Sequence, residues 1–409
     1  MKKLSASTIY LLESFIFSFA FRLAFTTYVI YRVQVLGLDP LQLVLAGTVL
    51  ESTVFLFEIP TGIVADLYSR RLSSIIGFAL LGIGILIEGL APLFSVLILS
   101  QVITGLGWTF TSGAYSAWIT DEVGSDKVGQ LFLRSGQLSN FGSLLAILPA
   151  IWISNLNLAY PFLVGGAMLI LLALFMVLFM PETGFEPVPK KDREGWRSMF
   201  VHFKAGLNLV RARQVLMIYA IIALLIGLYS EAWDRLAQPF LLQNYTFPDL
   251  LGVQMDAIAW FGFLSASALL IGILANEIAR RVIDTSASQQ LLRALQWLFI
   301  GMFLSLLFFT LSGQFFAAIL AMLIFDVLRK VSFPLSNAWL NQQLDSKLRA
   351  TLLSMTGQLD ALGQLSGGPF LGFIGRLRSL RTALITSALL LAPVSALYRR
   401  IEHNMDSEK

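Results

Sequence analysis

The sequence predicts an all-α membrane protein whose twelve transmembrane helices form two parallel six-helix halves. Three observations lead to this prediction. Hydrophobic residues make up 56% of the 409 residues and charged residues only 13%, whereas a soluble domain carries about 25% charged residues. Twelve long apolar runs follow one another along the chain, and motifs in the second six repeat motifs in the first six in fixed register.

Composition and motif content exclude several other classes of protein. The chain has no cysteine, so neither a disulfide scaffold nor a thiol nucleophile is available. It has no phosphate-binding loop, and its two histidines, His202 and His403, lie far apart in sequence. The net charge of +4 is spread between apolar runs rather than gathered on one face. We therefore expect no enzyme activity, no cofactor, no metal site and no nucleic-acid partner.

The apolar runs have the length that a membrane requires, because a hydrocarbon core about 30 Å thick needs about 20 residues per helix. They are too long for barrel strands and do not alternate in polarity. Glu13 and Arg22 interrupt the first run, so we expect it to remain a helix rather than act as a cleaved signal peptide. The expected spans are 8–31, 41–65, 72–92, 95–119, 131–154 and 158–180, followed by 214–242, 252–278, 291–311, 314–340, 350–374 and 382–398.

Loop charges set the expected orientation. Most lysines and arginines fall in loops on one side, which the positive-inside rule assigns to the cytoplasm, although Arg32, Arg376, Arg378 and Arg381 fall on the other side. Both termini are therefore expected in the cytoplasm, in a bacterial-type plasma membrane. The expected domains are an N-terminal six-helix bundle (1–180), a cytoplasmic linker with an amphipathic helix from about Trp196 to Arg213 (181–213), and a C-terminal bundle with a short tail (214–409).

An internal repeat relates the two halves. The segment from Gly62 to Arg71 matches that from Gly272 to Arg281 at an offset of 210 residues. At an offset of 221 residues, Ala117-Trp118 matches Ala338-Trp339, and Gly136-Gln137-Leu138 matches Gly357-Gln358-Leu359. Parallel halves imply a pseudo-twofold axis along the membrane normal and a cavity near mid-membrane that opens to one side at a time.

The first copy of the repeat carries a recognisable motif. Gly62-x-x-Ala65-Asp66-x-x-x-Arg70-Arg71 resembles the loop signature of the major facilitator superfamily, and the lead-in Glu58-Ile59-Pro60-Thr61 resembles its drug:proton antiporter branch, especially the macrolide-efflux-like members. Gln101 stands where the family's fourth-span motif usually carries an arginine. The resemblance implies a monomeric secondary transporter that exports a small amphipathic compound by alternating access, with protons and membrane lipids as its other partners.

The motif also predicts a gate. Asp66 lies at the cytoplasmic end of its span, where it can accept hydrogen bonds, and the arginines can anchor at the anionic inner leaflet. Such a cluster can form in one conformation and break in another, although a simple positive-inside turn would have the same sequence. The gate candidates are Glu58, Gly62, Asp66, Arg70 and Arg71, with Gly272, Asn276, Arg280 and Arg281 in the second copy.

Charges inside the spans are the candidates for proton coupling, because a charge in a membrane is costly and usually faces a cavity or a partner. Arg22 and Glu51 are expected at nearly the same depth, close enough to pair. Asp326 shares a helix face with Arg329 and Lys330, whereas Glu88 is expected at the interface. Fixed structural ion pairs are the alternative. The proton-coupling candidates are Glu51, Arg22, Asp326, Glu231 and Asp234.

Aromatic and polar residues within the spans are candidates for the substrate cavity, since flat aromatic walls suit amphipathic or cationic ligands. Trp108 and Tyr115 are expected to share one helix face at a spacing of seven residues. An interfacial aromatic belt would use the same residue types. The cavity candidates are Tyr28, Trp108, Tyr115, Tyr229, Trp233, Arg329, Gln358 and Asp360.

Other functions remain open at the level of sequence. The same fold suits proton-coupled or facilitative transport of a sugar, a metabolite or a lysolipid, because fold alone does not choose the substrate. A polar, narrow cavity would favour a metabolite, and a wide aromatic cavity with a lone acid would favour drug export. A non-transporting membrane receptor or an intramembrane enzyme is a further alternative, against which the duplicated motif argues.

Overall fold

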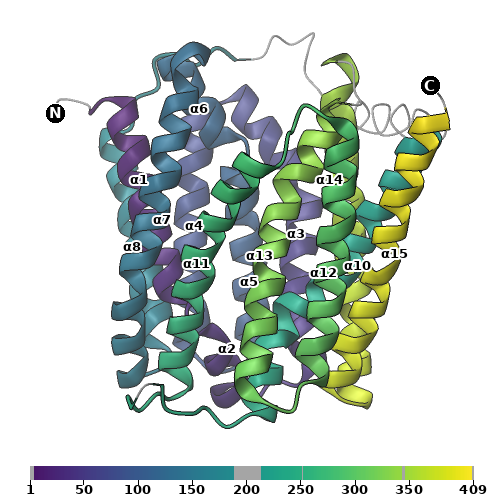
Figure 1. The fold of residues 1–409 in the computed structure, drawn as a ribbon. Helices are drawn as coiled ribbons and strands as arrows, with labels where there is room; N and C mark the ends of the chain where they lie inside the picture. The colour runs from purple at the N-terminus through teal and green to yellow at the C-terminus, as the bar shows by residue number, and fades with distance from the viewer. Residues whose placement is uncertain (1–3, 188–212, 251, 343–345, 408–409) are drawn as a thin grey trace. The chain divides into compact units, whose positions relative to one another are not determined.

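The computed structural model describes residues 4–187, 213–250, 252–342 and 346–407, and within these ranges the regular structure is helical (Figure 1). The predicted all-α, six-plus-six architecture is confirmed. The first half contains α1 (Ala6–Phe25), α2 (Tyr28–Ile30), the π-helix η1 (Tyr31–Val35), α3 (Pro40–Leu67), α4 (Arg70–Leu90), α5 (Phe94–Thr111), α6 (Ala114–Val123), α7 (Ser125–Leu156) and α8 (Tyr160–Phe179).

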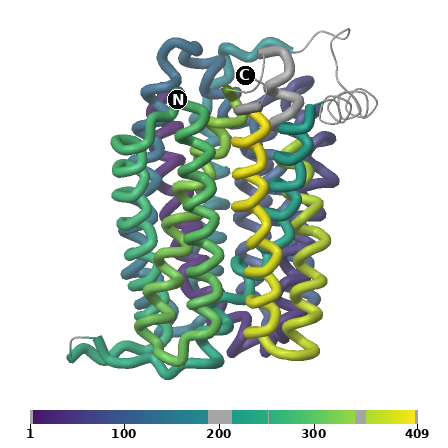
Figure 2. The backbone as a smooth tube through the Cα atoms, turned by 45° about the vertical axis from the view of Figure 1, so that its right-hand side comes forward, coloured from purple at the N-terminus to yellow at the C-terminus, as the bar shows by residue number. Residues whose placement is uncertain are grey.

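The second half contains six long helices, which are α10 (Gln214–Asn244), α11 (Ala257–Val282), α12 (Ser288–Leu311), α13 (Phe315–Gln342), α14 (Ser346–Leu377) and α15 (Leu380–Ser407). Successive long helices run in opposite directions, as the backbone trace shows (Figure 2). The amphipathic helix predicted from Trp196 to Arg213 lies almost entirely outside the described residues.

Ten spans in the described ranges are long and apolar enough to cross a membrane. The helices α13 and α14 complete the predicted twelve: they have 28 and 32 residues, which is sufficient length, but they carry Asp326, Arg329, Lys330 and Asp360. These two helices are less apolar than the other spans because they carry candidate site residues, which are Asp326 and Arg329 on α13 and Gln358 and Asp360 on α14.

Two of the expected spans are interrupted. The first span bends at Thr27, between α1 and α2, and continues as the π-helix η1. The fourth span breaks at Gly113, whose φ of 72° favours glycine. This break overturns the expectation that Trp108 and Tyr115 share one helix face, because they lie on α5 and α6.

The chain divides into two compact units. The first unit comprises 1–38, 49–197 and 255–265, and the second comprises 39–48, 198–254 and 266–409. The first residues of α3 thus belong to the second unit, where Asp39 Oδ2 lies 3.6 Å from Arg376 Nε. The sequence did not indicate that 39–48 would belong to the second unit and 255–265 to the first.

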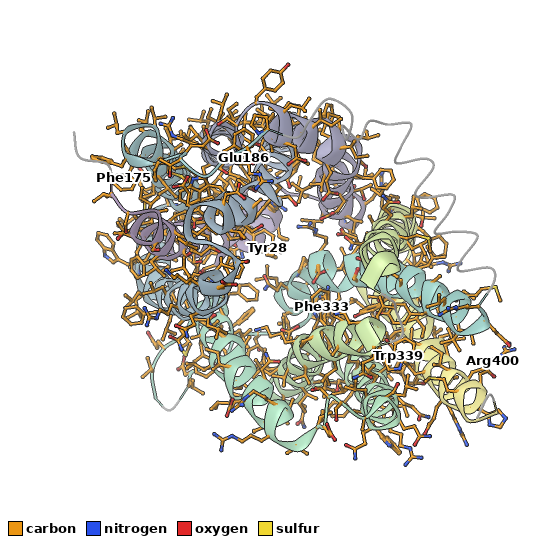
Figure 3. The ribbon with its side chains drawn as sticks, turned by 90° about the horizontal axis from the view of Figure 1, so that it is seen from above. Tyr28, Phe175, Glu186, Phe333, Trp339 and Arg400 are labelled. Atoms are coloured by element: carbon orange, nitrogen blue, oxygen red, sulfur yellow. The ribbon has the colours of Figure 1, made fainter. Side chains whose placement is uncertain are left out.

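Glycine contacts bring helices together within each unit. In the first unit, a Cβ on Gly166 of α8 would lie 2.7 Å from the carbonyl oxygen of Gly82 on α4. In the second unit, a Cβ on Gly363 of α14 would lie 2.8 Å from the backbone nitrogen of Leu228 on α10. These approaches let the helix backbones pack closely, as small residues do in other membrane proteins. Viewed from above, Trp339 lies among the helices of the second unit and Arg400 at its edge (Figure 3).

Candidate functional site

A cavity of about 790 Å³ lies within the second unit, between α10, α12, α13 and α14. Its size is that of a pocket for a small organic molecule. One part of the wall is polar and another part is aromatic. The polar lining includes Asp326, Arg329, Lys330, Asn337, Asp360 and Gln364, and the aromatic lining includes Tyr219, Tyr229, Phe299 and Phe333.

Arg329 is held by a bidentate ion pair. Its Nη1 and Nη2 atoms lie 2.5 and 2.8 Å from the two carboxylate oxygens of Asp234 on α10. This fork geometry is the strongest arrangement of an arginine with a carboxylate. Lys330, the next residue on α13, donates to the carbonyl oxygen of Ala268 at 2.7 Å. The helical spacing places both cations near Asp326, as predicted, but Arg329 pairs with another helix.

The carboxyl groups of Asp326 and Asp360 are held by neutral donors. Trp233 Nε1 donates to Asp326 Oδ1 at 2.9 Å, and Gln364 Nε2 donates to Asp360 Oδ2 at 2.7 Å. In the described part of the chain, neither carboxyl group forms an ion pair. Both carboxyl groups line the cavity, so they can accept a positive charge from a ligand or a proton.

Trp233 differs from its predicted role. It does not line the cavity but is 4% exposed, with its ring centroid 4.0 Å from that of Phe325 and 5.2 Å from that of Phe309. It acts on the cavity through its bond to Asp326. Of the other four cavity candidates in the second unit, three line the cavity, namely Tyr229, Arg329 and Asp360. Gln358 does not line it.

Glu231 forms a separate pair beside this cavity. Its Oε2 atom lies 3.4 Å from Nε of Arg235, one helical turn further along α10. Only 3% of the Glu231 side chain is exposed. A Cβ at Gly47 would lie 2.6 Å from Oε2 of Glu231, so a glycine at that position makes room for the pair. The geometry therefore assigns Glu231 to an ion pair rather than to the cavity wall.

The expected pair between Arg22 and Glu51 is absent from the first unit. Within the described residues, the guanidinium group of Arg22 forms no hydrogen bond or ion pair with Glu51 or any other residue. Equal depth along two helices did not bring the side chains together, because the direction in which each points depends on packing. Both residues are half-buried.

The other candidates in the first unit lie in its aromatic core. Tyr115 stacks on Tyr10 and Trp118, and Trp108 meets Phe17 and Phe21 edge to face. The ring of Tyr28 lies 5.0 Å from the guanidinium carbon of Arg32. These residues pack the interior of the first unit and do not line the second unit's cavity.

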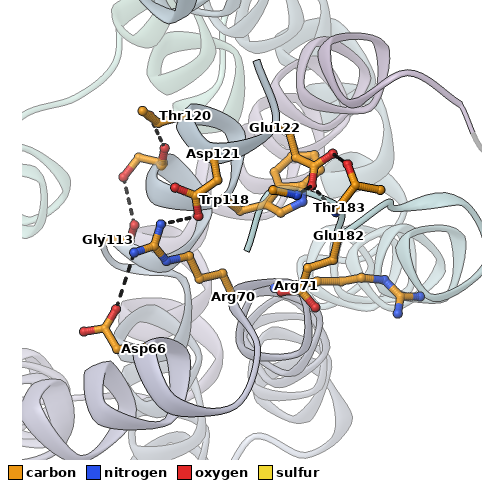
Figure 4. Close-up of polar contacts among 12 residues, drawn as sticks. Asp66, Arg70, Arg71, Gly113, Trp118, Thr120, Asp121, Glu122, Glu182 and Thr183 are labelled. Carbon is orange, nitrogen blue, oxygen red and sulfur yellow. Dashed lines mark hydrogen bonds and ion pairs between the residues drawn. The ribbon is translucent and has the colours of Figure 1, made fainter. Parts of the chain in front are cut away.

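Three of the gate candidates, Asp66, Arg70 and Arg71, belong to a polar cluster in the first unit (Figure 4). Arg70 forms an ion pair with Asp121 on α6 and lies 3.7 Å from Asp66. Ser69 caps α4 by accepting a bond from the backbone nitrogen of Leu72 at 2.8 Å. Asp121 is a functional candidate that the sequence reasoning missed, since nothing near it in sequence marks it as the partner of Arg70.

The segment 181–184 is bound to the same cluster (Figure 4). Glu182 accepts from the Ser69 hydroxyl at 2.6 Å and from the backbone nitrogen of Arg71 at 2.9 Å. Trp118 donates to the carbonyl oxygen of Pro181 at 2.8 Å. The predicted cluster is thus larger than the loop motif and includes the exit from α8.

Two residues of the predicted gate behave differently from expectation. A Cβ on Gly62 would meet nothing within 4 Å, so no close helix contact in the described residues requires a glycine there. Glu58 is exposed, and its carboxylate has no hydrogen bond within the described residues. Neither residue therefore contributes a side-chain contact to the cluster around Arg70.

The second copy of the motif is not equivalent to the first. Glu277 accepts from Arg280 at 2.8 Å and from Arg281 at 2.7 Å, all on the exposed surface of α11. Asn276 donates to the carbonyl oxygen of Gly272 at 3.1 Å. Both arginines thus pair within their own helix, whereas Arg70 reaches another helix.

A buried ion pair between Arg32 and Glu88 was also missed. Arg32 Nε and Nη2 donate to the two oxygens of Glu88 at 2.8 and 3.0 Å, and the side chains are 2% and 1% exposed. Gln101 Nε2 donates to the same carboxylate at 3.3 Å. Arg32 was expected in an outer loop but lies in the π-helix η1, and Glu88 lies near the end of α4 with its side chain buried against Arg32. The polar Gln101 within an apolar run was the available signal.

Comparisons with known proteins agree with this architecture. Residues 11–367 match the family described as the Major Facilitator Superfamily. The chain is 22% identical over 374 residues to "Uncharacterized MFS-type transporter YxaM" of Bacillus subtilis (strain 168), with 90% of each chain covered.

Solved structures show the same fold. A mutant of the nucleoside transporter NupG gives a TM-score of 0.79 at 13% identity, covering 97% of this chain and 100% of that one. A POT family transporter in complex with a thioalcohol-conjugated peptide gives 0.75 at 14% identity, covering 95% and 94%. A bacterial homologue of the human lysosomal transporter Spinster gives 0.73 at 16% identity, covering 97% of each.

Proposed function

Because the chain belongs to the major facilitator superfamily and is a multi-pass membrane transporter of that type, we propose a transport reaction for it. We propose that it exchanges protons for a small cationic amphipathic compound, which it exports by alternating access. The observation that carries the proposal is the pair of carboxyl groups, Asp326 and Asp360, that line the second unit's cavity without an ion pair in the described residues.

A cavity of this composition suits a ligand with one polar and one apolar side. The aromatic wall of Tyr219, Tyr229, Phe299 and Phe333 would cover an apolar body, and cations bind favourably over such rings. The carboxyl groups would bind the charged end. An amphipathic cation therefore has a partner for each of its parts.

Proton coupling follows if one carboxyl group binds either ligand or proton but not both. Asp326 is the proposed exchange group, because Trp233 orients it with a neutral donor and it forms no ion pair within the described residues. In a cell whose proton gradient points inward, such competition drives the compound outward. Glu51 on α3 is the proposed coupling carboxyl group of the first unit, while Glu231 and Asp234 hold Arg235 and Arg329 in place.

The second candidate is a zwitterionic metabolite, which Lys330 on the same cavity wall favours by offering a cation for a carboxylate or phosphate. Nucleoside and peptide transporters share the fold at low identity. For such a substrate the same carboxyl groups would bind the substrate's ammonium group, and transport would run inward with protons.

The test uses the full chain in vesicles with an imposed pH gradient and an internal pH dye. Lipophilic cations, macrolides, sugars, zwitterionic metabolites and lysolipids are added in turn to wild type, Asp326→Asn, Asp360→Asn and Glu51→Gln, with the exposed carboxyl variant Asp126→Asn as control. We expect cations to dissipate the gradient in wild type and Asp126→Asn, and we expect Asp326→Asn to lose the proton movement that cations drive. Equilibration of labelled substrate without proton movement in wild type would make the protein a facilitator.

A further inference from the structure

A second cavity, of about 500 Å³, lies within the first unit between α1, α6 and α7. It contains the carboxyl group of Glu13, which none of the features described above uses. Only 6% of Glu13 is exposed. A buried carboxyl group without a purpose is costly in a membrane protein, so its surroundings indicate what it binds.

The described side chains that line the cavity with Glu13 include no cation, neither a lysine nor an arginine. The Ser14 hydroxyl donates to Glu13 Oε2 at 3.4 Å, a weak bond. The hydroxyl of Tyr115, a residue only 9% exposed, lies beside the same carboxyl group but forms no hydrogen bond of good geometry. The carboxyl group thus has spare capacity that faces the cavity.

Aromatic rings surround this carboxyl group. The ring centroid of Tyr10 lies 5.1 Å from that of Tyr115 and 5.9 Å from that of Phe132, and Phe17 completes the aromatic lining. All four of these rings line the cavity. A carboxylate among several rings is the chemistry by which proteins bind organic ammonium groups.

The repeat relates this cavity to the one in the second unit. The 221-residue offset places Ser135, Gly136 and Ser139 opposite Thr356, Gly357 and Asp360, and both sets line the cavity of their own unit. Tyr115 and Ser116 correspond in the same way to Ser336 and Asn337. The two cavities therefore lie at corresponding positions of the repeat. The acid on α14 in the second half is Asp360, whereas its counterpart in the first half is Ser139, and the acid in that cavity is Glu13 on α1.

We propose that the first unit's cavity is a binding site for an organic cation, which forms an ion pair with Glu13 and contacts the rings of Tyr10 and Tyr115. The inference rests on the proposed function for the class of ligand alone. Each half would then contribute one carboxylate-and-aromatic site, built from corresponding positions but with the acid on a different helix.

The experiment measures equilibrium binding of radiolabelled tetraphenylphosphonium to the full chain in lipid nanodiscs, with empty nanodiscs subtracted. The variants are Glu13→Gln, Asp326→Asn, their double variant, and Asp126→Asn as the exposed carboxyl control. We expect Glu13→Gln to weaken binding at least about tenfold, both alone and in the Asp326→Asn background, because the charge partner is lost. Asp126→Asn is expected to bind as wild type does.

The outcomes separate the two proposals. If Glu13→Gln binds as wild type does in both backgrounds, the inference is overturned. If Glu13→Gln weakens binding while Asp326→Asn does not, the first-unit site stands and the proposed second-unit site fails. Should Glu13→Gln not fold, Tyr10→Leu and Tyr10→Phe decide the question: we expect the first to weaken binding and the second to retain it, and equal affinities would contradict the inference.

Discussion

The guanidinium group of Arg329 on α13 donates to both carboxylate oxygens of Asp234 on α10, at 2.5 and 2.8 Å. This pair has a consequence for Asp326, which lies one turn earlier on the same helix as Arg329. Because Asp234 occupies the guanidinium group, Asp326 is left with the neutral indole of Trp233 as its hydrogen-bond donor. The ion pair between Arg329 and Asp234 thus keeps the carboxyl group of Asp326 available in the cavity.

The first prediction concerns this competition. Asp234→Asn should free Arg329 to pair with Asp326 and so lower substrate-driven proton flux. New pairing of about 1.4 kcal/mol would lower it about tenfold. The double variant Asp234→Asn/Arg329→Gln should recover part of the flux, because no guanidinium group remains to occupy Asp326. Vesicle proton flux measures both, and a double variant less active than Asp234→Asn would contradict the mechanism.

The second prediction concerns the buried pair of Arg32 and Glu88. Removing one partner, as in Glu88→Gln, leaves an uncompensated buried charge and should lower the free energy of unfolding by about 3 to 5 kcal/mol. The double variant Arg32→Met/Glu88→Leu should lose much less, because no buried charge remains. Thermal unfolding in detergent measures this. The exposed Arg293, paired with Glu402, provides the control, since Arg293→Gln should change stability by about 1 kcal/mol or less.

These two pairs show how far the sequence can be read. Hydropathy predicts the helices, because each span must form its backbone hydrogen bonds within itself in the membrane. The charges inside the spans point to Asp326, Asp360 and Arg329, which line the second unit's cavity. Sequence spacing places charges along and around one helix, so it correctly groups Asp326 with Arg329. It does not give the direction in which a helix faces its neighbours. For that reason Arg22 and Glu51 were expected to pair and do not, whereas Arg32 and Glu88 pair without having been expected to.

The third prediction distinguishes the two acidic partners of Arg70. Asp121 forms the close ion pair, and Asp66 lies 3.7 Å away with 54% of its side chain exposed. Asp121→Asn should therefore reduce transport more than Asp66→Asn if the cluster as seen here is one state of the gate. Initial rates of substrate uptake into vesicles, corrected for the amount of folded protein, make the comparison. A larger loss in Asp66→Asn would mean that another state of the cluster limits transport.

The fourth prediction concerns the second copy of the motif. Arg280 and Arg281 are each 72% exposed and pair with Glu277 on their own helix, and ion pairs so exposed to solvent contribute little to stability. We expect Arg280→Gln and Arg281→Gln to retain most of the transport rate, in contrast to Arg70→Gln. Equal losses in all three variants, measured in the same vesicle assay, would show that both copies gate the protein.

The fifth prediction links helix packing to the second unit's cavity. A Cβ on Gly227 of α10 would collide with the carbonyl oxygen of Asp360 and lie 3.0 Å from the backbone nitrogen of Gln364 on α14. Gly227→Ala should therefore push α14 away, lower the free energy of unfolding by about 1 to 3 kcal/mol, and weaken cation binding because Asp360 moves with the backbone. Gly129→Ala on α7, where a Cβ would meet nothing within 4 Å, should be neutral or slightly stabilising, since alanine favours a helix. If thermal unfolding and tetraphenylphosphonium binding are unchanged in Gly227→Ala, close contact between α10 and α14 does not position Asp360.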